Sequence, residues 1–96
     1  MERKRFSNQE LNASYSVILL NDNFNTFDYV SHCLKKYIPN MTSEQAWQLT
    51  HKVHSEGKAV VWCGCQELAA LYRMQLSGAG LTVAFLEKEY SPCHVT

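Results

Sequence analysis

The sequence has no long hydrophobic run, little glycine or proline, and no excess of charge of either sign. No segment approaches the ~18–20 consecutive apolar residues that a membrane-spanning helix needs. Nine basic and nine acidic residues cancel, which argues against binding of nucleic acid or an anionic membrane through bulk charge. The stretch MERKRFSNQELNAS at the start is charged and has no apolar segment behind it, so we expect no secretory signal.

The sequence also lacks a cysteine spacing that indicates a disulfide framework. Of the four cysteines, Cys33 and Cys63 lie within apolar patterns. The spacing of Cys63 and Cys65 is one residue short of a Cys-x-x-Cys motif. We therefore expect free thiols and a reducing compartment.

What remains is the composition of one ordinary globular domain. The chain has 96 residues, of which 46% are apolar and 19% charged, enough for a modest single core. We expect a folded domain over residues 15–88. A flexible N-terminal extension (1–14) and a C-terminal tail (89–96) should flank it.

The order of apolar patterns and helix caps predicts an α+β domain of the form β-α-α-β-α-β. Strands are expected at residues 15–20, 58–63 and 81–86. Helices should begin after the N-cap residues Thr26 and Thr42, and a third should cover residues 66–77. Gly57 should end the second helix. Such elements form two layers, a three-stranded antiparallel sheet with helices packed on one face.

Short polar side chains fill the junction between the first strand and the first helix. The loop contains the carboxylate of Asp22 and the amides of Asn21, Asn23 and Asn25. Such residues often satisfy turn backbones and cap helices. The same acceptors also suit a cation that carries several N–H donors, such as an ammonium group. Composition alone leaves both interpretations open.

Three stretches together are similar to the ClpS family, small adaptors that bring N-degron substrates to a AAA+ unfoldase–protease. They are VILLNDNFNTFDYV at 17–30, VHSEGKAVV at 53–61 and GLTV at 80–83. The resemblance covers about residues 15–86. It implies a non-enzymatic adaptor, without a cofactor or metal, that binds a protein N-terminus and a ClpA- or ClpC-type unfoldase.

The resemblance also implies roles for individual residues. The free α-amino group, largely cationic at neutral pH with a pKa of roughly 7.7–8.0, should contact an acceptor set. A bulky apolar first side chain should enter a neighbouring pocket, and one acidic residue should dock on the unfoldase N-terminal domain. The acceptor set is Asn21, Asp22, Asn23 and His54; the pocket is Asn25, Phe27, Val30, Thr50, Val53 and Leu81; the docking residue is Glu67.

The chain departs from the usual family pattern at the pocket. Asn23 stands where an acidic residue is common, and Phe27 and Thr50 replace two methionines. Because flexible thioethers adapt to different guests, their loss should narrow the range of first residues. We expect aromatic first residues to be preferred over leucine. Such divergence suggests a specialised second copy, as cyanobacteria carry.

Two other functions are compatible with the same residues. The chain could be a ClpS-fold interaction module that has lost or changed N-terminus binding. Less favoured is a small metal or redox protein built on histidines and cysteines, because the ligand sets are incomplete; these residues are His51, His54, Cys63 and Cys65. The adaptor interpretation places the protein in the bacterial cytoplasm, or in the plastid stroma if the source is a plant.

Overall fold

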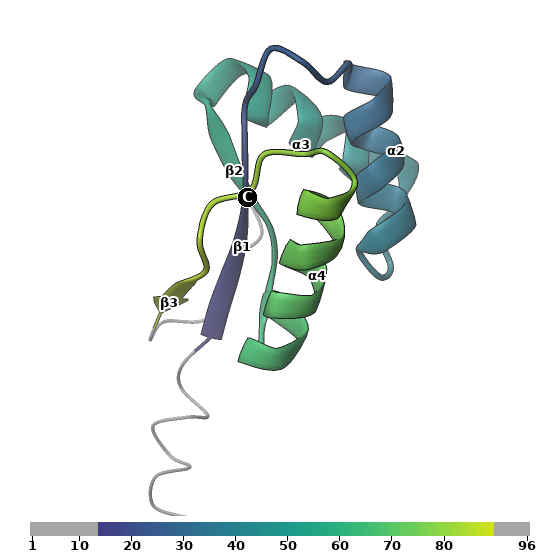
Figure 1. Cartoon of the computed structure of the whole chain (residues 1–96). Helices are drawn as coiled ribbons and strands as arrows, with labels where there is room; N and C mark the ends of the chain where they lie inside the picture. The colour runs from purple at the N-terminus through teal and green to yellow at the C-terminus, as the bar shows by residue number, and fades with distance from the viewer. Residues whose placement is uncertain (1–13, 90–96) are drawn as a thin grey trace, which may run out of the picture.

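A computed structural model describes residues 14–89 of the chain (Figure 1). The predicted C-terminal tail, except Glu89, and the predicted N-terminal extension, except Ser14, lie outside the described residues. The elements in chain order are β1 (Ser14–Leu20), α2 (Phe27–Tyr37), α3 (Ser43–Glu56), β2 (Lys58–Gly64), α4 (Gln66–Gly78) and β3 (Glu87–Glu89).

The sheet has the strand order β2-β1-β3, and β1 pairs antiparallel with both neighbours. Alternate residues of the two long strands face the helices, with Val17 and Leu19 on β1 and Ala59 and Val61 on β2. These side chains form one buried cluster with residues of α2, α3 and α4. The predicted α+β fold, a three-stranded antiparallel sheet with helices on one face, is confirmed.

The prediction of a third strand at residues 81–86 is wrong in its position. This segment runs beside β1 and makes one isolated bridge, between Val83 and Leu19. The backbone N–H of Leu20 donates to the carbonyl of Thr82, and that of Ala84 donates to the carbonyl of Ile18. The regular strand is the shorter β3 that follows. Within this segment Leu81 is buried, whereas Phe85 is 83% exposed, so the apolar pattern did not correspond to a continuous ladder with β1.

The predicted starts of α2 and α3 and the predicted end of α3 are confirmed by their caps. Thr26 accepts a hydrogen bond from the backbone of Tyr29, and Thr42 forms a capping box with Gln45. Gly57 ends α3 with φ of 93°, a left-handed conformation that favours glycine. Its carbonyl accepts a hydrogen bond from the Asn21 N–H at 2.9 Å. The last turn of α3 is thereby fixed beside the start of the polar loop.

The prediction of free thiols is confirmed for two cysteines and wrong for a third. Cys33 is buried with a free thiol, and Cys65 is exposed with a free thiol. Cys63, in contrast, is disulfide-bonded. It lies half-buried near the end of the edge strand β2.

Across residues 14–89, no helix is both long enough and apolar enough to cross a membrane.

Candidate functional site

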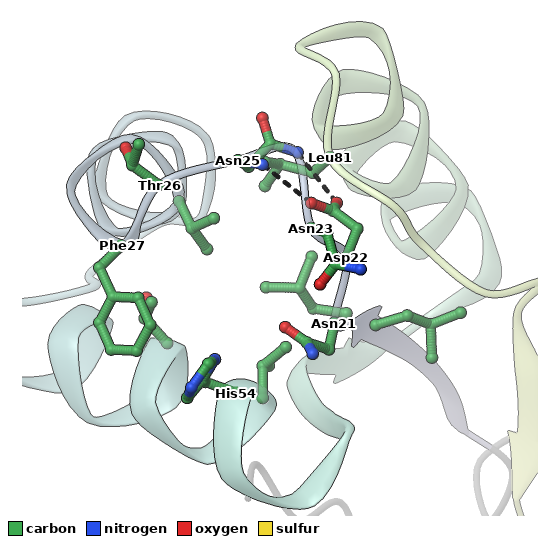
Figure 2. A pocket seen from close by; sticks show the side chains of 13 residues that line it. Asn21, Asp22, Asn23, Asn25, Thr26, Phe27, His54 and Leu81 are labelled. Carbon is green, nitrogen blue, oxygen red and sulfur yellow. Dashed lines mark hydrogen bonds between the residues drawn. The ribbon is translucent and has the colours of Figure 1, made fainter.

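A cavity of about 240 Å³ lies where the polar loop meets α2, α3 and the turn after α4 (Figure 2). The structure brings all of the predicted acceptor and pocket residues to this cavity. They are Asn21, Asp22, Asn23, Asn25, Phe27, Val30, Thr50, Val53, His54 and Leu81. Residues far apart in the sequence thus form one polar and apolar site.

Three further lining residues were not predicted from the sequence. Leu19 and Leu20 line the cavity at the end of β1, and Thr26 lines it as the N-cap of α2. Their positions in the sequence, directly before the polar loop or at the N-cap that follows it, could have indicated that they line the cavity. A strand that ends in a binding loop necessarily contributes its last residues to the site.

Asn21 and His54 flank the same end of the cavity (Figure 2). Asn21 is the first loop residue, and His54 projects from the last turn of α3. Both side chains are solvent-exposed. The bond between the Asn21 N–H and the Gly57 carbonyl keeps these two segments together. This end of the cavity therefore presents an amide oxygen and an imidazole nitrogen, which accepts when the imidazole is neutral.

The carboxylate of Asp22 is occupied within the protein. Oδ1 accepts from the backbone N–H groups of Phe24 and Asn25, each at 2.9 Å. Oδ2 accepts from Asn25 Nδ2 at 2.9 Å and from Thr82 Oγ1 at 2.8 Å. Because a carboxylate offers about four acceptor positions, these bonds use its capacity. We call Asp22, Asn25 and Thr82 the Asp22 latch.

The Asp22 latch connects the loop at residues 21–25 to the turn that follows α4. Asn25 Nδ2 also donates to the carbonyl of Gly80 at 2.9 Å, beside Leu81 in the cavity wall. Tyr29 donates its hydroxyl proton to the carbonyl of Ala79 at 2.5 Å. Two sides of the cavity, from opposite ends of the sequence, are thus held at a fixed separation.

The latch also keeps Asp22 charged. Burial alone would raise the pKa of Asp22, but hydrogen bonds from the backbone of Asn25 and Phe24 and from the side chains of Thr82 and Asn25 outweigh it. They lower the pKa from 3.8 to about 2. Asp22 therefore places a negative charge at the cavity at every physiological pH.

The other walls are apolar. Val53 and Leu81 are buried, and Val30 is half-buried. Thr50 is buried too, and its hydroxyl donates to the carbonyl of Ala46 at 2.8 Å within α3. Because this hydroxyl already has a partner, the Thr50 side chain adds no unsatisfied donor to the cavity. The interior suits an apolar guest.

Phe27 forms the rim beside His54. Its ring makes edge-to-face contacts with Trp47, His51 and His54, at centroid distances of 5.5, 5.0 and 5.0 Å. The two histidines thus contact an aromatic ring. Within the described part of the chain, no three His, Cys, Asp or Glu residues are grouped as metal ligands would be.

Glu67 lies apart from the cavity. It is exposed in the first turn of α4, where a negative charge is favourable to the helix dipole. The structure therefore separates the predicted docking residue from the predicted peptide-binding residues.

Comparison with known proteins identifies related adaptors. Residues 10–84 match the family described as "ATP-dependent Clp protease adaptor protein ClpS". The ClpS adapter proteins of Thermosynechococcus vestitus and of Nostoc sp. are 63% and 55% identical to this chain. These matches span 79% and 90% of this chain and 81% and 89% of the relatives. A chloroplastic relative, CLPS1 of Arabidopsis thaliana, is 46% identical over 70% of this chain and 42% of its own length.

A solved structure agrees with these matches. Agrobacterium tumefaciens ClpS2 bound to L-phenylalaninamide superposes with a TM-score of 0.71 and 25% identity, covering 81% of this chain and 99% of that one. The relatives are named adapter proteins, in agreement with the expected non-enzymatic role. This chain therefore belongs to the ClpS family of adaptor proteins of the ATP-dependent Clp protease.

Proposed function

We propose that this adaptor binds the free α-amino group and the bulky apolar first side chain of N-degron substrates, and delivers them to a ClpA- or ClpC-type unfoldase. The observation that supports this is an acceptor-lined mouth directly beside an apolar cavity. The related ClpS2 is bound to L-phenylalaninamide, a molecule with an α-amino group and an aromatic side chain. No cofactor or metal takes part.

The α-amino group donates to Asn21 and His54 in this proposal. Asn21 Oδ1 accepts one proton, and a ring nitrogen of neutral His54 accepts another. Asn23, also at the cavity, offers a further amide oxygen. Charge-assisted hydrogen bonds of this kind contribute about 1.5–3 kcal/mol each.

Asp22 acts on the ammonium group through its charge. The latch already uses its acceptor positions, so the carboxylate has little capacity for another donor. Its negative charge still favours a cation at the mouth. The latch bonds also hold Asn21 and Asn23 in the conformation that presents their side chains.

The cavity accepts the first side chain of the substrate. Its volume of about 240 Å³ exceeds that of an engineered apolar cavity of about 150 Å³ that binds benzene, so a phenyl ring fits. Phe27 at the rim can make an edge-to-face contact with such a ring, an arrangement that stabilises aromatic pairs by about 0.5–1.5 kcal/mol. We therefore propose that aromatic first residues bind more tightly than leucine.

A panel of peptides that differ only in the first residue tests the pocket. Replacing a first phenylalanine by alanine should weaken binding about 10- to 150-fold, because burial of such a side chain is worth about 1.5–3 kcal/mol. Leucine should lie between the two. Fluorescence polarisation with labelled peptides measures each affinity. Equal affinity for alanine would contradict the pocket, and tighter or equal binding of leucine would contradict the aromatic preference.

Docking on the unfoldase is assigned to Glu67, remote from the cavity. Substitution Glu67→Lys should weaken binding to an isolated unfoldase N-terminal domain about tenfold, because a cationic group that attracts the glutamate would repel the lysine. Peptide affinity should not change. Glu44→Lys is the matched control, because Glu44 lies in the first turn of α3 and is also exposed. Equal effects of the two substitutions would reject this assignment.

The cellular compartment is inferred from the related proteins. The similar proteins come from cyanobacteria and, in one case, carry the name of a chloroplast protein. We propose the bacterial cytoplasm, or the plastid stroma of a plant, as the compartment.

A further inference from the structure

Three rings lie along one face of α3 and lead away from the cavity. Trp47, His51 and His54 are spaced four and three residues apart, so they stack along the same side of the helix. Trp47 and His51 are 5.4 Å apart between ring centroids. Phe27 reaches across from α2 and contacts all three. We call Phe27, Trp47 and His51 the aromatic ridge.

The aromatic ridge is more exposed than packing of two helices requires. Trp47 is 42% exposed, and His51 is exposed as well, although tryptophan side chains are on average highly buried. Neither residue lines the cavity. Phe27 lines the cavity and also belongs to the ridge, so the cavity mouth and the exposed rings form one continuous surface.

We propose that the aromatic ridge binds the side chains of the second and third residues of the N-degron, and favours aromatic ones. This inference rests on the proposed function, which places the amino terminus at His54. Trp47 precedes His54 by two helical turns, about 10 Å along the axis at about 1.5 Å per residue. An extended peptide advances about 3.3 Å per residue, so a peptide that runs along α3 from His54 toward Trp47 brings its second and third residues level with the ridge.

The side chains of the aromatic ridge favour aromatic side chains in the substrate. Indole, phenyl and imidazole rings offer faces and edges to another ring, and each such pair contributes about 0.5–1.5 kcal/mol beyond area burial. None of the three side chains carries a fixed charge that would attract an ionic partner. A second aromatic residue in the substrate is therefore favoured over a small or charged one.

Peptides with a fixed first phenylalanine test this inference. With alanine at positions two and three as reference, tryptophan at either position should tighten binding about 2- to 12-fold. Trp47→Ala should abolish this gain, measured as the ratio of the two affinities within the same variant, and Trp47→Phe should restore it. Phe85→Ala is the matched control, because Phe85 is an aromatic residue, 83% exposed, that does not line the cavity.

The outcomes separate this inference from the proposed function. Equal affinities for the reference peptide and the two tryptophan peptides would overturn only the proposal that the ridge binds side chains. A gain that persists in Trp47→Ala would do the same. Failure of every phenylalanine-first peptide to bind would overturn the proposed function together with the ridge. In a Trp62→Phe background, Trp47 is the remaining tryptophan, and its emission should shift more with a tryptophan-free peptide that has phenylalanine at position two than with the reference peptide. An unchanged emission would also overturn the ridge.

Discussion

Acetylation of the amino terminus of a phenylalanine-first peptide is expected to lower its affinity for this adaptor more than a hundredfold. The acetyl group removes the positive charge and leaves one N–H of the three, so Asn21 and His54 can no longer both accept a hydrogen bond from the leading nitrogen. Two charge-assisted hydrogen bonds at about 1.5–3 kcal/mol each give about 3–6 kcal/mol, which corresponds to a factor of more than one hundred. Isothermal titration calorimetry with the free and acetylated peptides measures the ratio.

Variants of the two acceptors show whether this ratio arises at the proposed site. Asn21→Ala and His54→Ala should each lower the affinity for the free peptide. The ratio of the affinities for the free and acetylated peptides should therefore fall. His32→Ala is the matched control, since His32 is an exposed histidine on α2 that does not line the cavity. It should leave the ratio unchanged. Equal affinity of the free and acetylated peptides for the unmodified protein would reject the proposed recognition.

Removal of the Asp22 carboxylate should have the second large effect. Asp22→Ala is expected to weaken peptide binding more than tenfold, because it removes the charge at the mouth and releases the loop that presents Asn21. It should also lower the free energy of unfolding by about 1–2 kcal/mol, a figure reduced for the partial exposure of these charge-assisted bonds. Calorimetric titration and urea denaturation measure the two effects.

Asp28→Ala is the control for Asp22→Ala. Asp28 is an exposed carboxylate in the first turn of α2, outside the cavity lining. Its removal should cost about 0.5 kcal/mol through the helix dipole alone and leave peptide affinity unchanged. Similar losses of affinity in both variants would show that the latch has no special role.

The stabilising effect of Asp22 should depend on pH in a defined direction. Its pKa in the folded protein is lowered from 3.8 to about 2. The unfolded chain therefore binds the proton first as the pH falls, and the contribution of the carboxylate is complete above about pH 3.8 and lost as the pH falls through 2. The stability difference between the unmodified protein and Asp22→Ala should be the same at pH 7 and pH 5, and smaller near pH 2. A constant difference across this range would contradict the latch.

Features that depend on neighbouring residues were predictable from the sequence. The N-caps Thr26 and Thr42 and the stop at Gly57 are local signals, and each appears where it was expected. The β-branched and aliphatic residues at 15–20 and 58–63 likewise predicted the two long strands. The strand at residues 81–86 was misplaced, because pairing with β1 depends on distant backbone and not on the apolar pattern.

The cavity was predictable only with help from the family resemblance. Composition showed an acceptor-rich loop at Asn21 and Asp22, but could not decide between a turn and a binding site. The bond from Thr82 to Asp22 joins residues 60 positions apart, and no local pattern indicates it. The contacts of Phe27 with Trp47 and His51 similarly join two helices. Such features become visible only when the chain is folded.

A crystal structure of the adaptor with a bound phenylalanine-first peptide tests the central proposal most directly. The account predicts that the leading nitrogen lies within about 3.2 Å of Asn21 Oδ1 and of a His54 ring nitrogen, with the first aromatic ring inside the cavity beside Val53 and Leu81. A peptide bound elsewhere on the protein, or bound here with its leading nitrogen directed into solvent, would contradict it.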